Sequence, residues 1–124
     1  MLVGLGIDVA SITRMERALN RFGDRFAARV LTELELEQLA RRADRGCFVA
    51  GRFAVKEAAF KALGGPRDVG WHDLEVDAGP EGVPMLRLRC AALPHADRLG
   101  VSRVWVSISH DAGVAAAVVV LESS

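Results

Sequence analysis

The 124-residue sequence alternates between stretches with the hydrophobic pattern of strands and stretches with that of helices. An almost continuous apolar run over residues 2–9 predicts a short buried strand. Ser11 is placed to cap a helix whose apolar side chains keep helical spacing as far as about Gly23. Thr32 and Glu35 form a capping-box sequence, which predicts the start of a second helix.

The rest of the chain continues this alternation. A helix from about Gly46 to Leu63 is predicted by its apolar composition and by the Gly-Gly-Pro sequence that follows it. The remaining expected elements are the end of the second helix near Ala43, a hairpin of residues 71–78 and 83–90, a weaker helix over 91–99, and a last hairpin of residues 103–110 and 114–121. This order predicts an α+β fold in which a mostly antiparallel sheet is packed by helices.

Composition limits the possible functions. The 16 basic and 16 acidic residues balance, so a binder of nucleic acid or membrane surfaces, which depends on excess positive charge, is not expected. The longest apolar run, residues 114–121, is far shorter than the roughly 18 residues of a membrane span. The apolar start contains Asp8 and lacks the basic region of a signal peptide, and the cysteines and histidines lack zinc-site spacing. We therefore expect one cytoplasmic domain over residues 1–124.

The helix predicted over residues 46–63 carries the most informative charges. Fourteen of the 16 basic residues are arginine, and Lys56 and Lys61 are the only lysines, which suggests that a compact ammonium group is needed there. Glu57 shares one helix face with Phe53 and Lys61, and a carboxylate among aromatic rings needs a partner. One interpretation is a Glu57–Lys61 ion pair that serves only helix stability, and the other is a binding site.

Asp8 is the second candidate, because it nearly ends an otherwise apolar strand. A carboxylate at this place can make a turn or cap contact, or it can contribute to a metal or phosphate site. Asp8 and Glu57, with water and phosphate oxygens as the remaining ligands, would hold Mg²⁺ in the usual way. Three basic side chains near them, Arg52, Lys56 and Lys61, would then suit a polyphosphate.

The sequence Ser-Ile-Ser-His-Asp at residues 107–111 is the third candidate. Ser109 and His110 end a predicted strand at a tight turn. Adjacent strand residues point to opposite faces, which argues against a Ser–His catalytic pair. His110 as a hydrogen-bond donor to phosphate is one interpretation, and a histidine at a hairpin corner without a functional role is the other.

Three segments together are similar to one family. They are GIDVASITR at residues 6–14, RFAVKEAAFKALG at residues 52–64, and SISHD at residues 107–111 before an Ala-rich strand. In this order they resemble the holo-acyl-carrier-protein synthases, the small bacterial class of 4'-phosphopantetheinyl transferases. The resemblance spans nearly the whole chain. It implies Mg²⁺-dependent transfer of 4'-phosphopantetheine from coenzyme A to a serine of an apo acyl carrier protein, with release of 3',5'-ADP.

The resemblance also implies roles for individual residues. It implies that Asp8 and Glu57 are the metal ligands. It also implies that coenzyme A is contacted by Lys61, by His110, by Arg52 at the ribose 3'-phosphate, and by Gly64 in the adjacent loop. Glu57 is the nearest candidate for the base that removes the serine proton, directly or through a water bound to the metal, which we favour. Lys61 would neutralise charge on the transferring phosphoryl group. Family members are typically homotrimers with each site at a subunit interface.

The sequence departs from the family pattern after Gly64, where Gly65 and Pro66 replace a frequent Thr-Gly pair. The sequence therefore leaves open whether this loop contacts the phosphates. A module that binds coenzyme A or a carrier protein without turnover is the alternative function.

Arginines on the first predicted helix suggest where a carrier protein docks. Arg14 and Arg21, with Arg17 between them, form a stripe beside the apolar one, and the carrier proteins of this family are acidic. A solvated helix face is the simpler interpretation. The sequence leaves open whether the carrier serves fatty acid, polyketide or peptide synthesis.

Overall fold

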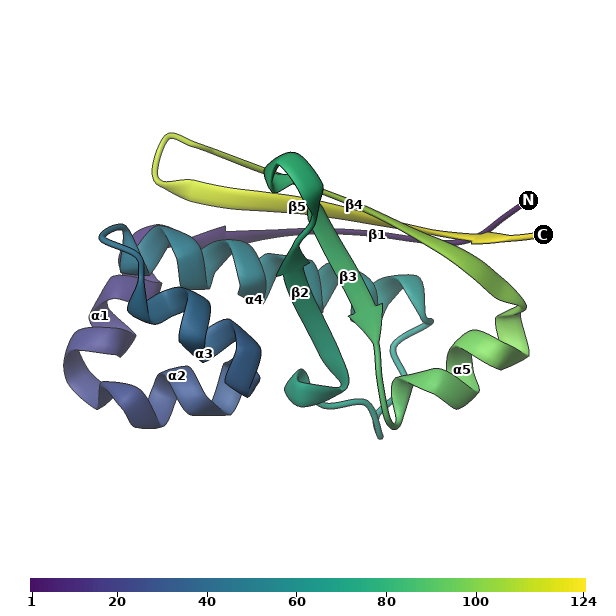
Figure 1. The fold of residues 1–124 in the computed structure, drawn as a ribbon, viewed down its shortest axis with the longest axis horizontal. Helices are drawn as coiled ribbons and strands as arrows, with labels where there is room; N and C mark the ends of the chain where they lie inside the picture. Colours follow the sequence, from purple (N-terminus) through teal and green to yellow (C-terminus); the bar gives the residue numbers. More distant parts are fainter.

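Helices and two antiparallel sheets make up the computed structural model, which describes residues 1–124 (Figure 1). In chain order the elements, with η for a short 3-10 helix, are β1 (Leu2–Ser11), α1 (Ile12–Phe22), α2 (Asp24–Val30), α3 (Glu33–Ala40), α4 (Arg45–Ala62), η1 (Trp71–Asp73), β2 (Leu74–Ala78), η2 (Pro80–Gly82), β3 (Pro84–Leu88), α5 (Ala92–Leu99), β4 (Val101–Asp111) and β5 (Val114–Ser123). The predicted α+β class with antiparallel strands is confirmed.

The larger sheet has the strand order β1-β5-β4, so the first strand of the chain pairs with the last. Its register places Asp8 opposite Ala117 on β5, and Ala117 opposite Ile108 on β4. Helix α4 lies along one face of this sheet (Figure 1). The chain termini lie together at one end of the sheet, and the turn between β4 and β5 lies at the other.

Strand β1 contacts α4 through glycine. A Cβ atom on Gly6 would lie 1.8 Å from the carbonyl oxygen of Ala58, and one on Gly4 would lie 2.3 Å from that of Ala62. The absence of both side chains lets the backbones of strand and helix approach directly. Because alternate residues share a strand face, Asp8 faces the same side as these glycines and lies beside α4.

The other face of the larger sheet is exposed and apolar. Leu5, Ile7 and Val9 on β1 are 66%, 63% and 58% exposed, and Trp105 on β4 is 51% exposed. The prediction of a fully buried first strand is therefore wrong for this face. The sequence pattern indicates two apolar faces, but the chain supplies an element to cover only one of them.

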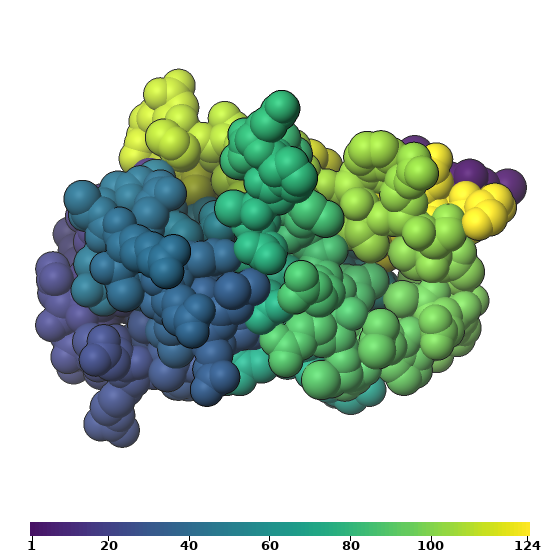
Figure 2. Space-filling model, viewed as in Figure 1, coloured from purple at the N-terminus to yellow at the C-terminus, as the bar shows by residue number.

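The smaller sheet contains only β2 and β3, whereas the sequence pattern predicts one mostly antiparallel sheet. This hairpin crosses over α4 (Figure 1), and Figure 2 shows it as a ridge between the first three helices and α5. The sequence pattern also misses α2, whose seven residues are too few for clear periodicity and which packs through Ala27 and Val30. Helix α3 ends at Ala40, slightly earlier than expected.

Helix α4 forms the centre of the core, as its apolar composition predicts. Eleven of its 18 residues are buried. Buried side chains of both sheets and of the shorter helices pack with it in one hydrophobic cluster. None of the helices has the length and apolarity that crossing a membrane requires. The expected cytoplasmic location stays a prediction.

Candidate functional site

Lys61 connects the last turn of α4 to strand β1. Its ammonium group donates to the carbonyl oxygen of Ile7 at 2.9 Å and to a carboxylate oxygen of Asp8 at 3.1 Å. The Asp8 side chain is 18% exposed and that of Lys61 is 53% exposed, so the pair lies at the surface. A pair this exposed contributes little to stability, and its ammonium stays accessible to a ligand.

Glu57 lies one helical turn before Lys61. Burial raises the pKa of its carboxyl group, the negative charge of Asp8 raises it further, and the positive charge of Lys61 opposes both effects. Glu57 forms no ion pair within 4 Å, so the alternative of a Glu57–Lys61 pair serving helix stability is not what the structure contains. The fold thus brings together two repelling carboxylates and one ammonium, from segments about 50 residues apart.

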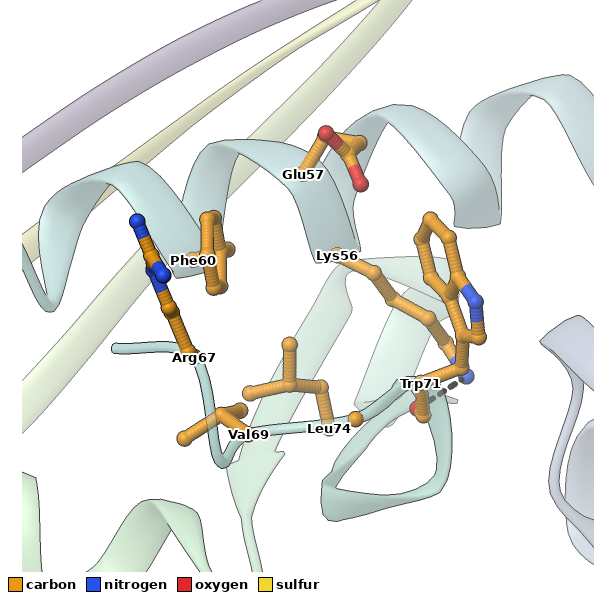
Figure 3. A pocket seen from close by; sticks show the side chains of 8 residues that line it. Lys56, Glu57, Phe60, Arg67, Val69, Trp71 and Leu74 are labelled. Atoms are coloured by element: carbon orange, nitrogen blue, oxygen red, sulfur yellow. Dashed lines mark hydrogen bonds between the residues drawn. The ribbon is translucent and has the colours of Figure 1, made fainter. Parts of the chain in front are cut away.

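A pocket of about 360 Å³ opens beside Glu57. Figure 3 shows it between α4 and the segment that follows α4. Its lining residues are Lys56, Glu57, Phe60, Arg67, Val69, Gly70, Trp71 and Leu74. The Trp71 ring packs against Phe53 with ring centroids 5.0 Å apart, which gives the wall an aromatic backing. The sequence reasoning misses Arg67 and Trp71 as site residues, because their approach to α4 depends on how the chain reverses after Gly64.

Lys56 does not offer its charge to a ligand, contrary to the sequence-based suggestion that it suits a polyphosphate. Its side chain is completely buried and its ammonium lies 2.6 Å from a carboxylate oxygen of Glu35. It also donates to the carbonyl oxygens of Val30 at 2.6 Å and Trp71 at 3.0 Å. With three acceptors already present, Lys56 joins α2, α3 and the pocket wall to α4.

Arg52 lies on the side of α4 that faces α3. Its guanidinium stacks on the Phe48 ring at 4.2 Å and donates to Gln38 at 3.3 Å. Burial lowers its pKa, and its Nε atom is buried without a hydrogen-bond partner. The structure therefore does not place Arg52 with Asp8 and Lys61.

Gly64 and His110 lie at opposite ends of α4. Gly64 follows the helix directly, and its N–H donates to the carbonyl oxygen of Lys61 at 3.0 Å. His110 is exposed and nearly ends β4, whose turn to β5 lies at the end of the sheet near the start of α4 (Figure 1). Since 16 residues of helix span about 24 Å, one chain does not bring His110 to Lys61.

The arginines of the first helix are at the surface. Arg14 and Arg21 on α1 are exposed, and neither forms an ion pair. Arg21 lies over the ring of Phe22, which is itself 54% exposed. The structure thus presents a basic surface with an aromatic residue on α1.

The carboxylates of Asp8 and Glu57 fit a divalent cation that takes its remaining ligands from water and substrate. No cluster of three or more acidic, histidine or cysteine side chains forms a complete protein cage. Mg²⁺ commonly uses one or two carboxylates and fills its remaining positions with water and substrate phosphates. Burial and then the negative charge of Asp8 raise the pKa of Glu57, and a bound cation would offset both effects.

Comparisons of sequence and of fold find similar proteins of one kind. A holo-[acyl-carrier-protein] synthase from Nitratidesulfovibrio vulgaris is 48% identical, covering 99% of this chain and 100% of the relative. The crystal structure of the synthase from Neisseria meningitidis superposes with a TM-score of 0.90 at 31% identity, covering 99% and 100%. The synthase from Bacillus anthracis, solved with coenzyme A (3',5'-ADP), superposes with a TM-score of 0.82 at 38% identity, covering 100% and 99%.

A model of one family describes most of the sequence. The description of the 4'-phosphopantetheinyl transferase superfamily matches residues 4–119. This range includes all three segments on which the sequence resemblance rests, and the relatives above match end to end. The resemblance noted from the sequence is therefore confirmed, and the chain belongs to the 4'-phosphopantetheinyl transferase superfamily.

Proposed function

We propose that this chain transfers the 4'-phosphopantetheine group of coenzyme A to a serine hydroxyl of an apo acyl carrier protein and releases 3',5'-ADP. The observation that carries the proposal is the meeting of Asp8, Glu57 and Lys61 beside a pocket, in a chain of this superfamily. Phosphoryl transfer depends mainly on charge neutralisation and alignment, and these three side chains supply both.

Each of the three charged groups has a role in this proposal. The Lys61 ammonium binds a phosphate oxygen of coenzyme A and offsets charge on the transferring group. Asp8 and Glu57 hold Mg²⁺, which when bound supplies positive charge to the pyrophosphate. Glu57 receives the serine proton, directly or through a water.

The pocket holds an uncharged part of coenzyme A. Phe60, Val69, Trp71 and Leu74 give it apolar walls, while Glu57 lies at its edge. A substrate lying across that edge places its pyrophosphate near the carboxylates and another part of the molecule against the walls. Gly64 lies next to Lys61, and the loop that begins there contributes to the phosphate site.

His110 and Arg52 act on coenzyme A phosphates from another copy of the chain. Both lie away from Asp8 and Lys61, and His110 is separated from Lys61 by nearly the whole of α4. If all four groups bind one substrate, the site needs two copies. A homotrimer with sites at its subunit interfaces satisfies this need.

The exposed face of the larger sheet is the surface on which copies assemble. Leu5, Ile7, Val9 and Trp105 lie on it, and all are more than half exposed. Contiguous apolar surface of this kind is typical of protein interfaces. Assembly also suits the limited core of a 13.3 kDa chain.

The basic surface of α1 docks the carrier protein. Arg14 lies three residues after Ser11, which caps α1 at the end of β1, so the stripe begins close to Asp8. Arg14 and Arg21 are exposed and without carboxylate partners. An acidic carrier bound there would present its serine toward the candidate site.

Mass spectrometry of carrier proteins tests this function. Apo carriers of fatty acid, polyketide and peptide synthesis are incubated with the chain, coenzyme A and Mg²⁺, and a gain of one phosphopantetheine is expected for at least one. The Asp8→Ala and Glu57→Ala variants, with thermal melting as the folding control, are expected to be inactive. Binding of coenzyme A without modification of any carrier would indicate a binding module instead. Full transfer in excess EDTA would remove the role of the metal.

A further inference from the structure

Arg67 is the only arginine that lines the pocket beside Glu57. It lies in the segment between α4 and η1, and its side chain reaches from that segment toward α4 on the far side of Phe60 from Glu57 (Figure 3). It is exposed and forms neither a side-chain hydrogen bond nor an ion pair. The other cation of the pocket, Lys56, is already paired with Glu35. Arg67 is thus the pocket's available positive charge.

The segment that carries Arg67 is fixed at both ends. The N–H of Gly65 donates to the carbonyl oxygen of Phe60 at 2.9 Å, which ties the start of the segment to α4. Val69 is buried, and its N–H donates to the carbonyl oxygen of Pro66 at 3.2 Å. A side chain on such a braced segment loses less conformational freedom when it binds a ligand than one on a loose loop.

The nearest carboxylate in sequence is turned away from Arg67. Asp68 accepts a hydrogen bond from His95 on α5 at 2.8 Å, and Arg98 contacts the other nitrogen of the same imidazole ring. Asp68 is therefore engaged on the α5 side of the segment. Neighbouring residues of opposite charge face different partners, which leaves the guanidinium of Arg67 without an internal counter-charge.

We propose that Arg67 binds a phosphate group of coenzyme A at the rim of this pocket. The inference rests on the proposed function, because that function places coenzyme A here. A guanidinium presents a planar set of donors that matches two phosphate oxygens, and such charge-assisted pairs are among the stronger hydrogen bonds of proteins. The contact is to either the pyrophosphate or the 3'-phosphate. The two possibilities predict different effects of Arg67→Ala when the substrate lacks the 3'-phosphate.

Steady-state kinetics of Arg67→Ala test the proposal. We expect the KM for coenzyme A to rise roughly tenfold or more, because a charged hydrogen bond is lost, while kcat stays within about twofold. The KM for the carrier protein is expected to stay unchanged. Arg67→Lys keeps the charge without the planar donors. Its KM for coenzyme A is expected to lie between those of the unmodified chain and Arg67→Ala. The matched control is Arg41→Ala, since Arg41 is an exposed arginine without an ion pair that lines no pocket near Glu57.

Repeating the measurement with 3'-dephospho-coenzyme A identifies the phosphate. If Arg67 contacts the 3'-phosphate, the effect of Arg67→Ala is expected to disappear with this substrate. If it contacts the pyrophosphate, the effect is expected to persist. An unchanged KM for both substrates in the folded variant would overturn the proposal.

Calorimetric binding of 3',5'-ADP and of coenzyme A to the unmodified chain separates this inference from the function on which it rests. If the unmodified chain binds and turns over coenzyme A but Arg67→Ala does so equally well, only the role of Arg67 fails. If the unmodified chain neither binds coenzyme A nor modifies a carrier, the function itself fails.

Discussion

The two lysines of the chain have opposite surroundings although they lie five residues apart. Lys56 is buried with one carboxylate and two carbonyl oxygens around its ammonium, and these acceptors suit a compact group with three donors better than a planar guanidinium. Lys61 is half exposed and lies beside Asp8. The same residue type therefore has a structural role at one position and is available to a ligand at the other.

Replacing Lys61 by arginine distinguishes catalysis from stability. If the ammonium acts on the transferring phosphoryl group, the longer, planar guanidinium is misplaced, and kcat is expected to fall roughly tenfold or more, which is about 1.4 kcal/mol. Lys61→Ala is expected to fall further. The measurement is steady-state kinetics, with thermal melting to verify folding. An unchanged kcat in folded Lys61→Arg would leave Lys61 with only its contact to β1.

Glu57 makes stability depend on pH in a defined direction. Burial, and then the charge of Asp8, raise its pKa in the folded state above the ordinary value of about 4.3. A group whose pKa is raised in the folded state stabilises the fold fully below its ordinary pKa, where it is protonated. This contribution to the stability is lost as the pH rises through the folded-state pKa. Ionised Glu57 therefore destabilises the ligand-free protein near neutral pH.

Melting curves of Glu57→Gln check this sign. At about pH 7.5 without metal or substrate, the variant is expected to have a higher Tm than the unmodified chain, because glutamine stays neutral. The difference is expected to shrink as the pH is lowered toward about 4, where the glutamate becomes protonated. A lower Tm of the variant at about pH 7.5 would mean that another contact of the ionised carboxylate outweighs its burial.

At the scale of elements, the contact between β1 and α4 determines the geometry of the site. A side chain at position 6 would collide with the carbonyl oxygen of Ala58, so the strand and the helix are in backbone contact. Asp8 follows on the same strand face and meets Lys61. A shift of β1 away from α4 would therefore separate the two charged groups.

The substitution Gly6→Ala is expected to destabilise the protein by about 1–3 kcal/mol, the range for overpacking, and to reduce kcat through displacement of Asp8. Denaturant unfolding and kinetics measure the two effects. Gly51→Ala is the control, because a Cβ atom there makes only an ordinary contact, 3.5 Å from Ile108. It also lies within α4, where alanine is favoured over glycine by about 1 kcal/mol. Equal behaviour of both variants would contradict the role of the close approach.

Helix α1 gives a prediction about the carrier protein. Reversing the charge at Arg14 with Arg14→Glu is expected to raise the KM for an acidic carrier roughly tenfold at low salt, with a smaller effect at high salt because the charges are screened. The KM for coenzyme A is expected to stay nearly unchanged. Arg41→Glu introduces the same charge change at the end of α3 and serves as the control. Equal effects on both substrates would argue against docking on α1.

At the scale of the whole molecule, the uncovered sheet face predicts assembly. Ile7 lies on this face and is 63% exposed, so Ile7→Asp is expected to leave the fold of one chain intact. Burial of a carboxylate between copies is costly, so if copies assemble on this face as proposed, we expect the variant to lose both assembly and activity. Light scattering at micromolar concentration and the transfer assay measure these outcomes. A fully active monomer of the unmodified chain would remove assembly from the function.

Mixing variants tests the same prediction from the site. Asp8→Ala and His110→Ala are each expected to be inactive alone. If one site takes Asp8 from one copy and His110 from another, mixed trimers refolded together contain some sites with both residues intact and regain part of the activity. No recovery in verified mixed trimers would contradict a site shared between copies.

The amino-acid sequence alone determines the local features of this protein. The capping box at Thr32 and Glu35, the long apolar helix and the final hairpin form where the pattern predicts them, because each depends on neighbouring residues. The candidate residues Asp8, Glu57 and Lys61 also stand out in the sequence, as charges within apolar segments. Short motifs of this kind record which chemistry is available.

The tertiary structure decides which of these charges can work together. Lys56 and Lys61 look alike in the sequence. Only the packing of α2 and α3 against α4 shows that Lys56 forms a buried ion pair with Glu35. The approach of Arg67 to the pocket, the separation of His110 from Lys61, and the uncovered face of β1 likewise depend on contacts between distant segments. Local sequence sets propensities, whereas burial and pairing arise from the fold as a whole.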